Sequence, residues 1–184
     1  MMKYLILINR EFPCKKGEAY LENEINEIAR YFDKVFIFPG DAILNEKETR
    51  NIDSKNVQIV KYESKSLNLR KVLYVLGSVK YFFSKENEGK KFINKLEEAY
   101  FLSAAYNQYY KILQEIGKIN ITSDDEVYLY SYWLYINAKV VTLLKKYFNG
   151  RNIKVKAFSR AHRFDIYEDR RKYNYLPQRN YLLD

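Results

Sequence analysis

Short apolar runs alternate with amphipathic segments along this chain, and this alternation is the feature that most constrains its fold. The stretches KYLILIN (3–9) and KVFIFP (34–39) are apolar at nearly every position, which is typical of strands buried on both faces of a parallel sheet. The segment between them, 18–32, repeats apolar side chains at the spacing of one helical face. These side chains are Leu21, Ile25, Ile28 and Phe32. The start of the chain therefore predicts a strand, a helix and a second strand.

The same alternation continues to the end of the sequence. Further strands are expected at 57–62, 126–131 and 153–159, and further helices at 67–83, 88–118 and 133–150. Strands that are separated by helices join a sheet in parallel through right-handed crossovers. We therefore expect one α/β domain with a Rossmann-like fold, in which helices flank both faces of a mostly parallel sheet.

Composition narrows the class of protein. Hydrophobic residues make up 47% of the 184 residues, with 19 Tyr and 11 Phe among them, so the chain can bury a core and lacks the composition of a disordered protein. The net charge of +9 favours anionic partners, namely nucleic acid, nucleotide phosphates or an acidic membrane surface. A lysine-rich, solvated surface accounts for the same charge, so composition alone does not choose among these partners.

Cysteine usage and hydropathy indicate the compartment. The single cysteine, Cys14, has no partner for a disulfide within the chain, which fits a reducing compartment. The opening stretch lacks the pattern of a signal peptide, and no segment approaches the roughly 20 apolar residues of a membrane span. We expect a cytoplasmic protein that can touch the inner face of the membrane. With no second histidine or cysteine beside it, Cys14 is a poor candidate for a catalytic nucleophile.

Two polar loops follow the first and the last predicted strands, NREFPCKKGEAY (9–20) and RAHRFD (160–165). Ligands of open α/β sheets bind beyond the carboxyl ends of the strands, so both loops are expected to face one site. In the first loop, Gly17 lets the backbone approach a ligand closely, and amides at the following helix start attract anions. The alternative is a lysine-rich turn in which Gly17 relieves strain and Glu18 favours the helix start, and the residues alone favour this alternative.

The second loop contains His162, the only histidine of the chain. An imidazole can hydrogen-bond sugar hydroxyls, act as an acid or base, or carry a charge beside a phosphate. Arg160 suits a phosphate or a carboxylate, and Asp165 can orient the histidine or accept a bond from a hydroxyl. The alternative is an ordinary loop histidine within a set of surface salt bridges. The residues of that set would be Asp165, Glu168, Asp169 and Arg170.

A third feature, YLYSYWLYINA (128–138), crosses from a predicted strand into a predicted helix at the same sheet edge. Ser131, Tyr132 and Trp133 can form one wall of a pocket there. Aromatic rings stack on sugars and on bases, although packing in the core is the commoner use of a ring such as that of Trp133. One histidine, one cysteine and no cluster of carboxylates give no zinc or iron ligand set. No metal is therefore expected.

Three stretches, taken in order, carry a resemblance to a known family. They are FPCKKGEAYLENEI (12–25), LYSYWLYINA (129–138) and SRAHRFDIYEDRRKYNYLPQRNYL (159–182). Together they resemble the N-terminal domain of a GT-B glycosyltransferase of the retaining family-4 type, found in bacterial polysaccharide and cell-surface glycan synthesis. The resemblance implies an enzyme of two facing Rossmann-like domains. The first domain mainly holds the acceptor, and the second holds most of the nucleotide-sugar donor.

The resemblance also implies roles for the loop residues. Gly17 and Glu18 match the loop that approaches the donor phosphates and the acceptor. His162 matches the histidine that reaches the transferred sugar, where it would stabilise charge as the bond to phosphate breaks. Asp165 matches the aspartate that commonly follows it, and Arg160 would support the loop or meet a phosphate. The family loop often has two glycines, whereas this loop has one glycine and two lysines.

The family continues beyond the stretches found here into a donor-binding domain. Residues 1–184 are therefore expected to be a truncated N-terminal half of a GT-B fold, which folds but does not transfer sugar by itself. The resemblance implies a nucleotide sugar as substrate, a glycan or lipid-linked acceptor, and no other cofactor. Contact with a membrane surface would follow from the basic charge if Lys and Arg cluster on one face.

Two other classes of function remain open. A basic nucleic-acid-binding module is allowed by the charge and the aromatic content. No signature of such a module is visible, however, and the basic residues alternate with acidic ones, so nucleic acid is not an expected partner. A non-catalytic interaction domain, without any site, is the other alternative.

Overall fold

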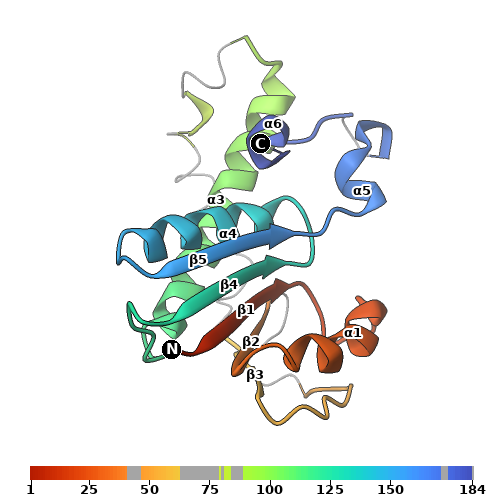
Figure 1. Cartoon of the computed structure of the whole chain (residues 1–184). Helices are drawn as coiled ribbons and strands as arrows, with labels where there is room; N and C mark the ends of the chain where they lie inside the picture. The colour runs from red at the N-terminus through yellow and green to blue at the C-terminus, as the bar shows by residue number, and fades with distance from the viewer. Residues whose placement is uncertain (41–46, 63–78, 80, 84–88, 171–173, 184) are drawn as a thin grey trace.

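The structure is a computed structural model of the whole chain. It describes residues 1–40, 47–62, 79, 81–83, 89–170 and 174–183. Most of the helix predicted at 67–83 lies outside these residues. The described residues confirm an α/β fold of the Rossmann-like class (Figure 1).

The described strands form one sheet in the order β3-β2-β1-β4-β5, and every neighbouring pair is parallel. The strands are β1 (Lys3–Asn9), β2 (Lys34–Pro39), β3 (Val57–Ile59), β4 (Glu126–Ser131) and β5 (Lys154–Ser159). β1 lies at the centre, where Ile6 pairs with Phe36 of β2 and with Leu129 of β4. The prediction of a mostly parallel sheet is confirmed, and the described sheet is parallel throughout.

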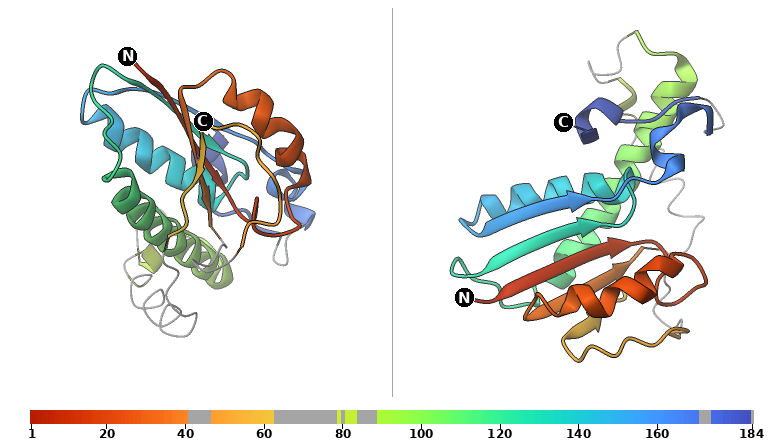
Figure 2. Two further views of the ribbon diagram at one scale, coloured as in Figure 1. Left: turned by 90° about the horizontal axis from the view of Figure 1, so that it is seen from below. Right: turned by 45° about the vertical axis from the view of Figure 1, so that its right-hand side comes forward.

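Helices cover both faces of this sheet. α1 (Ala19–Ala29) lies on one face, and α3 (Phe92–Ile116) and α4 (Ile136–Asn149) lie on the other (Figure 2). Beyond β5 the chain forms the short helices α5 (Arg163–Ile166), η2 (Glu168–Arg170, a 3-10 helix) and α6 (Arg179–Leu183). Among the described residues, no helix combines the length and the apolar character that crossing a membrane would require.

β1 and β2 are buried because their side chains fill two separate cores. In β1, Ile6 and Ile8 pack against α3 and α4, whereas Leu5 and Leu7 pack against α1. Successive residues of a strand point to opposite faces, so a run that is apolar at every position supplies both cores at once. The continuous run KYLILIN is therefore what fixes β1 in the middle of the sheet.

Element boundaries differ from the predicted ones mainly at the carboxyl edge of the sheet. The helix predicted from Trp133 begins only at Ile136, because Tyr135 has a backbone φ of 72° that a helix does not allow. The first helix begins at Ala19 because Glu18 adopts the left-handed conformation, with φ 58°. The strand predicted at 57–62 ends at Ile59.

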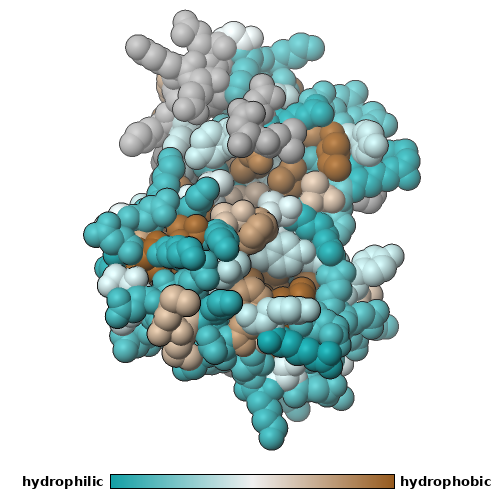
Figure 3. All heavy atoms as spheres, viewed as in Figure 1, coloured by the Kyte–Doolittle hydropathy of each residue, from teal (hydrophilic) through white to brown (hydrophobic). Residues whose placement is uncertain are grey.

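One half of the α1 face carries no helix among the described residues. Phe158 of β5 is 53% exposed there, and its ring stacks on that of Tyr128, with centroids 6.4 Å apart. Figure 3 shows apolar and near-neutral side chains gathered in the middle of the face that β4 and β5 present to the viewer. Lys156 lies beside these rings, with its Nζ 5.0 Å from the centroid of Tyr128.

Candidate functional site at the carboxyl edge of the sheet

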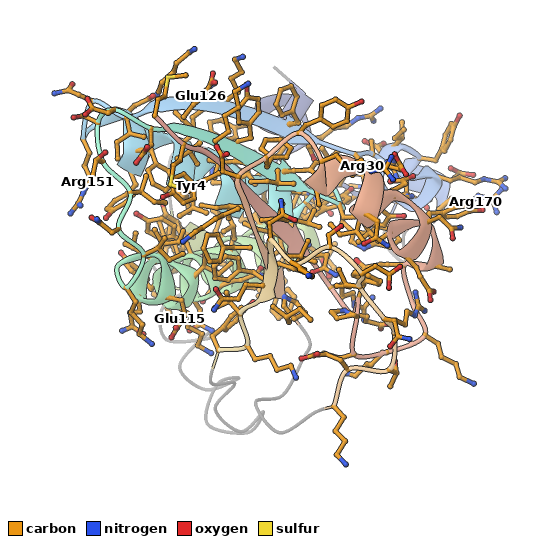
Figure 4. The ribbon with its side chains drawn as sticks, turned by 60° about the horizontal axis from the view of Figure 1, so that its bottom comes forward. Tyr4, Arg30, Glu115, Glu126, Arg151 and Arg170 are labelled. Carbon is orange, nitrogen blue, oxygen red and sulfur yellow. The ribbon has the colours of Figure 1, made fainter. Side chains whose placement is uncertain are left out.

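The loops after β1, β4 and β5 meet at the carboxyl edge of the sheet, where α1 departs to one face and α4 to the other. This is the switch point at which doubly wound sheets form a crevice. Arg170, beyond β5, lies toward this edge, whereas Glu126 and Arg151 lie at the opposite end of the sheet (Figure 4). The expectation that the two polar loops share one edge is therefore confirmed, and the individual contacts show how they meet.

Glu18 is the centre of the first loop. Its carboxylate accepts hydrogen bonds from the backbone N–H groups of Arg10, Glu11 and Phe12, each at 2.8 Å. The side-chain amide of Asn9 donates to the same carboxylate at 2.9 Å. Three successive amides that point at one anion form the kind of nest that binds phosphate in other folds. In this chain the nest holds the carboxylate of Glu18.

Gly17 lies beside this nest. Its N–H donates to Oε2 of Glu11 at 3.1 Å, and a Cβ built on Gly17 would lie 2.2 Å from the same oxygen. A larger residue would therefore push the Glu11 carboxylate aside. The N–H of Gly17 is thus engaged by the chain itself, and its predicted role toward a ligand stays a prediction.

Trp133 joins the first loop to the second. Its indole Nε1–H donates to Oε1 of Glu18 at 2.5 Å. The indole ring also packs against the imidazole of His162. The two ring centroids lie 4.2 Å apart, and the ring planes make an angle of 37°. Glu18, Trp133 and His162 come from three separate parts of the sequence, and here they form one continuous cluster, which we call the Glu18 cluster.

His162 is held at a second point. Its Nε2 lies 2.9 Å from the backbone carbonyl oxygen of Tyr132. A carbonyl oxygen only accepts hydrogen bonds, so Nε2 carries the proton when the ring is neutral. The imidazole also lies 5.0 Å from the Tyr132 ring. Its orientation is therefore fixed by the turn that follows β4.

Asp165 fixes the backbone around the histidine. It is 5% exposed, and its Oδ2 accepts from the N–H of His162 at 3.1 Å and from the N–H of Leu134 at 3.3 Å. His162 and Asp165 also form a capping box at the start of α5. The carboxylate thus ties the β4 turn to the β5 loop from within, and it does not lie among exposed side chains as a surface salt bridge would require.

Arg160 faces α1. Its guanidinium contacts Glu24, with Nη1 3.0 Å from Oε2, and lies 5.1 Å from the centroid of the Tyr132 ring. Burial lowers the pKa of Arg160, but the bonds to Glu24 outweigh it, so the pKa is raised and the group stays charged. Of its two predicted roles, support of the loop is the one for which the structure shows contacts.

The turn between β4 and α4 is strained. Tyr135 has φ 72° and ψ −129°, which side chains other than glycine rarely adopt. The residue is held there by packing against Phe101 of α3, with ring centroids 6.0 Å apart, and by Leu134 bonding to Asp165. Strained residues such as Tyr135 cluster at functional sites. Tyr132, in the same turn, has a buried hydroxyl; burial raises its pKa, so this phenol is neutral near pH 7.

An open depression lies next to the Glu18 cluster, on the segment that follows His162. It has a volume of about 640 Å³, and its lining residues are Arg163, Ile166, Tyr167, Asp169 and Arg170. Asp169 pairs with Arg170 at 3.7 Å. The depression thus combines an aromatic ring, an aliphatic side chain and two guanidinium groups, a lining that suits an anion attached to an apolar or ring-shaped group.

The described part of the chain contains no set of side chains that could hold a metal ion. No group of three or more His, Cys, Asp or Glu side chains converges there. Cys14 is 3% exposed, which restricts access to its thiol. The expectations about cofactors stay predictions.

Sequence reasoning named Tyr132 as part of a pocket wall, but it missed Asn9 and the contacts that Tyr132 makes within the Glu18 cluster. Asn9 is fully buried at the end of β1 and donates to Phe12 and to Glu18. Tyr132 supplies the carbonyl oxygen for His162 and a ring for Arg160. An asparagine that closes an otherwise apolar strand was the available signal for Asn9. No signal in the sequence indicates the role of a backbone carbonyl.

No protein-family model, no curated protein and no solved structure matches this chain. The likeness to a GT-B glycosyltransferase therefore rests on the residues quoted above. The structure by itself supports a Rossmann-like α/β domain with the Glu18 cluster at the carboxyl edge of its sheet.

Proposed function

We propose that this chain is the acceptor-side domain of a glycosyltransferase, which moves a sugar from a nucleotide-sugar donor to a cell-surface glycan or a lipid-linked acceptor. The observation that carries the proposal is the contact of Glu18, Trp133 and His162 at the switch point of the sheet. The sequence resemblance assigns the loops of Glu18 and His162 to the substrates, and Trp133 joins these two loops. The side chains that it selects come together from positions more than 100 residues apart in sequence.

His162 would be the catalytic residue of this site. Its Nε2–H is bonded to the Tyr132 carbonyl oxygen and its ring lies against Trp133, so the imidazole is held in place before the substrate arrives. With a proton on Nδ1 as well, this fixed imidazolium would stabilise the negative charge that develops on the leaving phosphate. In the proposed reaction the bond between the sugar and the donor phosphate breaks and the acceptor oxygen forms the new bond to the sugar. The proton of the acceptor hydroxyl passes to the leaving phosphate, and the nucleotide leaves with its phosphates.

The depression beside α5 would hold part of the substrate. Arg163 and Arg170 supply positive charge, and Tyr167, which is 54% exposed, supplies a ring that can lie against a sugar or a base. Its volume of about 640 Å³ lies within the range of small-molecule sites. These properties support an anionic, ring-containing substrate such as a nucleotide sugar or a phosphate-linked glycan.

A membrane-bound acceptor is supported by α3. Phe92, Leu96 and Tyr100 recur every fourth residue along this helix and are 69%, 43% and 58% exposed. Lys91 and Lys95 flank them. Aromatic and aliphatic side chains beside lysines suit the interface of an anionic bilayer. The part of α3 that carries them projects beyond the sheet (Figure 1).

Vesicle sedimentation tests the membrane contact. The protein is expected to sediment with phosphatidylglycerol vesicles and to remain in solution with phosphatidylcholine vesicles. The double change Phe92→Ser and Leu96→Ser should abolish sedimentation, whereas Tyr110→Ser, at an exposed position further along the same helix, should not. Equal sedimentation of all three proteins would rule this contact out.

The intact mass of the protein purified from its native cells tests the two-domain part of the proposal. The proposal expects a mass well above the 22.2 kDa of the present sequence, because a second α/β domain must hold the donor. Transfer assays on that longer protein would follow. His162→Ala should lower transfer about 100- to 1,000-fold, and Arg151→Gln, at the opposite end of the sheet (Figure 4), should leave it unchanged. A native mass of 22.2 kDa would contradict the proposal.

The face of β4 and β5 that no described helix covers favours a second candidate function, binding of single-stranded nucleic acid. The stacked rings of Tyr128 and Phe158, with Lys156 beside them, resemble the platforms on which bases stack. Fluorescence anisotropy with a labelled oligonucleotide tests this candidate. It would require tight binding that falls steeply with added salt and is weakened by Phe158→Ser; absence of binding at low salt would remove it.

A further inference from the structure

We propose that the loop after β1 is an anion-binding nest whose resident anion is the Glu18 carboxylate, and that this carboxylate is the positioning residue that holds the Trp133 indole against His162. In Rossmann-like domains the corresponding loop commonly offers its amides to a phosphate of the ligand. Here the amides of Arg10, Glu11 and Phe12 already have an acceptor. The inference does not depend on the glycosyltransferase proposal.

The two carboxylate oxygens divide five donors between them. Oε1 accepts from the N–H of Arg10 at 2.8 Å and from the indole N–H of Trp133 at 2.5 Å. Oε2 accepts from the N–H groups of Glu11 and Phe12 and from the side-chain amide of Asn9. All five are donors, so only a group with acceptor capacity on both oxygens satisfies them. A carboxylate has about four such positions, so two of the five donors share one of them, whereas the amide of glutamine offers one oxygen and turns its NH2 group, itself a donor, toward the nest.

The backbone of Glu18 shows that the chain tolerates strain at this position. Its φ of 58° and ψ of 41° lie in the left-handed region, which costs a residue with a Cβ more than it costs glycine. In this conformation Glu18 precedes the first residue of α1 and turns its side chain back over residues 9–12. A glycine would suit the backbone better, but it would leave five donors without their acceptor.

The carboxylate reaches His162 through Trp133. The indole bonds to Glu18 on its N–H edge and lies against the imidazole with its ring. Loss of the carboxylate would release the indole edge and therefore the surface that supports the imidazole. Because the chain has one tryptophan, fluorescence that is excited at the long-wavelength edge of indole absorption, where the 19 tyrosines do not absorb, reports this single indole.

The proposal is tested by removing the Glu18 carboxylate and supplying formate from solution in its place. Glu18→Gly should remain folded by circular dichroism, because glycine accepts the left-handed backbone. Its tryptophan emission should shift to longer wavelength, and acrylamide should quench it more strongly than in the unaltered protein. Sodium formate should reverse both changes in a saturable manner, because formate supplies the missing acceptor, and sodium chloride at equal ionic strength should not.

Matched variants separate this role from general stability. Glu27→Gly is an equivalent change at an exposed position of α1; it should lower stability, leave the emission of the folded protein unchanged and show no response to formate. If Glu18→Gly does not fold, Glu18→Gln replaces it, and its emission should shift in the same direction without rescue by formate, since the amide still fills the nest.

Three results would overturn the inference. The first is an emission spectrum of Glu18→Gly equal to that of the unaltered protein. The second is a shifted emission that formate and chloride affect equally. The third, where only Glu18→Gln folds, is emission and acrylamide quenching equal to those of the unaltered protein.

Discussion

Two glutamates of this chain, Glu18 and Glu98, each accept several hydrogen bonds, but their donors come from different parts of the structure. Glu18 takes four of its donors from residues 9–12 of its own loop and only one from far along the chain. Glu98, on α3, takes donors from the last part of the chain, about 80 residues away. The first carboxylate shapes a loop, whereas the second attaches a distant segment to the body of the domain.

Glu98 is 1% exposed. Its carboxylate accepts from the hydroxyl of Tyr175 at 2.5 Å and from the backbone and side-chain amides of Gln178 at 3.0 and 2.9 Å. Lys90 completes the set with an ion pair at 3.0 Å. Nearby, Leu176 packs into an apolar cluster with residues of α3 and α4. Burial and charge pairing therefore hold the C-terminal segment in place at this point.

The difference shows why a buried carboxylate does not by itself identify a functional site. Glu98 is the more buried of the two and has the stronger set of side-chain partners, yet it lies in a contact between structural segments. Glu18 is half-buried, and its one distant partner, Trp133, leads directly to the only histidine. What separates the two glutamates is the chemistry of the residue that each one orients.

Removal of the Glu98 carboxylate is expected to have the largest effect on stability. Glu98→Ala leaves Tyr175, Gln178 and Lys90 without their acceptor, and we expect the free energy of unfolding to fall by about 3 kcal/mol. Urea denaturation followed by circular dichroism measures it. Glu97→Ala, at the neighbouring position, is the control and should change stability by less than about 0.5 kcal/mol. Equal stability of the two variants would contradict the role given to Glu98.

Glu18→Gln is expected to have a smaller effect on stability, because the Glu18 side chain is half-buried whereas that of Glu98 is 1% exposed, and because the amide keeps one acceptor oxygen. We expect a loss of about 1–2 kcal/mol in the same denaturation experiment. The distinction between the two glutamates is supported if Glu18→Gln alters the fluorescence of Trp133 while Glu98→Ala does not. It is contradicted if Glu18→Gln destabilises the domain more than Glu98→Ala does.

A pH dependence distinguishes the two centres further. Burial raises the pKa of Glu98, but its hydrogen bonds outweigh burial and hold the pKa below the ordinary value of 4.5. A carboxylate with a lowered pKa in the folded state adds stability above the pKa of the unfolded state. That stability is lost as the pH falls through the lower, folded value. The gap in unfolding free energy between the unaltered protein and Glu98→Gln should therefore be constant near pH 7 and narrow on acidification below about 4.5. A gap that widens in acid would contradict this.

The smallest effect is expected at Phe158, which contacts neither glutamate. Phe158→Ser replaces a ring that is 53% exposed, and we expect a change in unfolding free energy within about 0.5 kcal/mol. A loss above about 2 kcal/mol, measured in the same urea series, would mean that the face of β4 and β5 that no described helix covers takes part in the core.

The fold could be predicted largely from periodicity. The runs at 3–9 and 34–39 and the spacing of Leu21 and Ile25 are local patterns, and burial on one or both faces produces them directly. Parallel pairing followed from the helices between strands. The ends of elements were less predictable, because the positive φ of Tyr135 is imposed by contacts with α3 and Asp165 that no local pattern reveals.

The candidate site was predictable in place and only partly in detail. The position of the loops at one edge follows from topology, so the meeting of the loops of Glu18 and His162 could be expected. The capture of the loop amides by Glu18 could not, because it depends on a left-handed backbone at one residue. Glu98 gave no signal at all, since its partners lie about 80 residues further along the chain.

The most direct test of the account is a proton NMR spectrum of the single indole and the single imidazole. The account predicts a nuclear Overhauser effect between the rings of Trp133 and His162, whose centroids lie 4.2 Å apart. It also predicts that Glu18→Gln shifts both ring signals and that Glu98→Gln shifts neither. Absence of the effect in the folded protein, or a shift of both signals in Glu98→Gln alone, would contradict the claim that Glu18, Trp133 and His162 form one site.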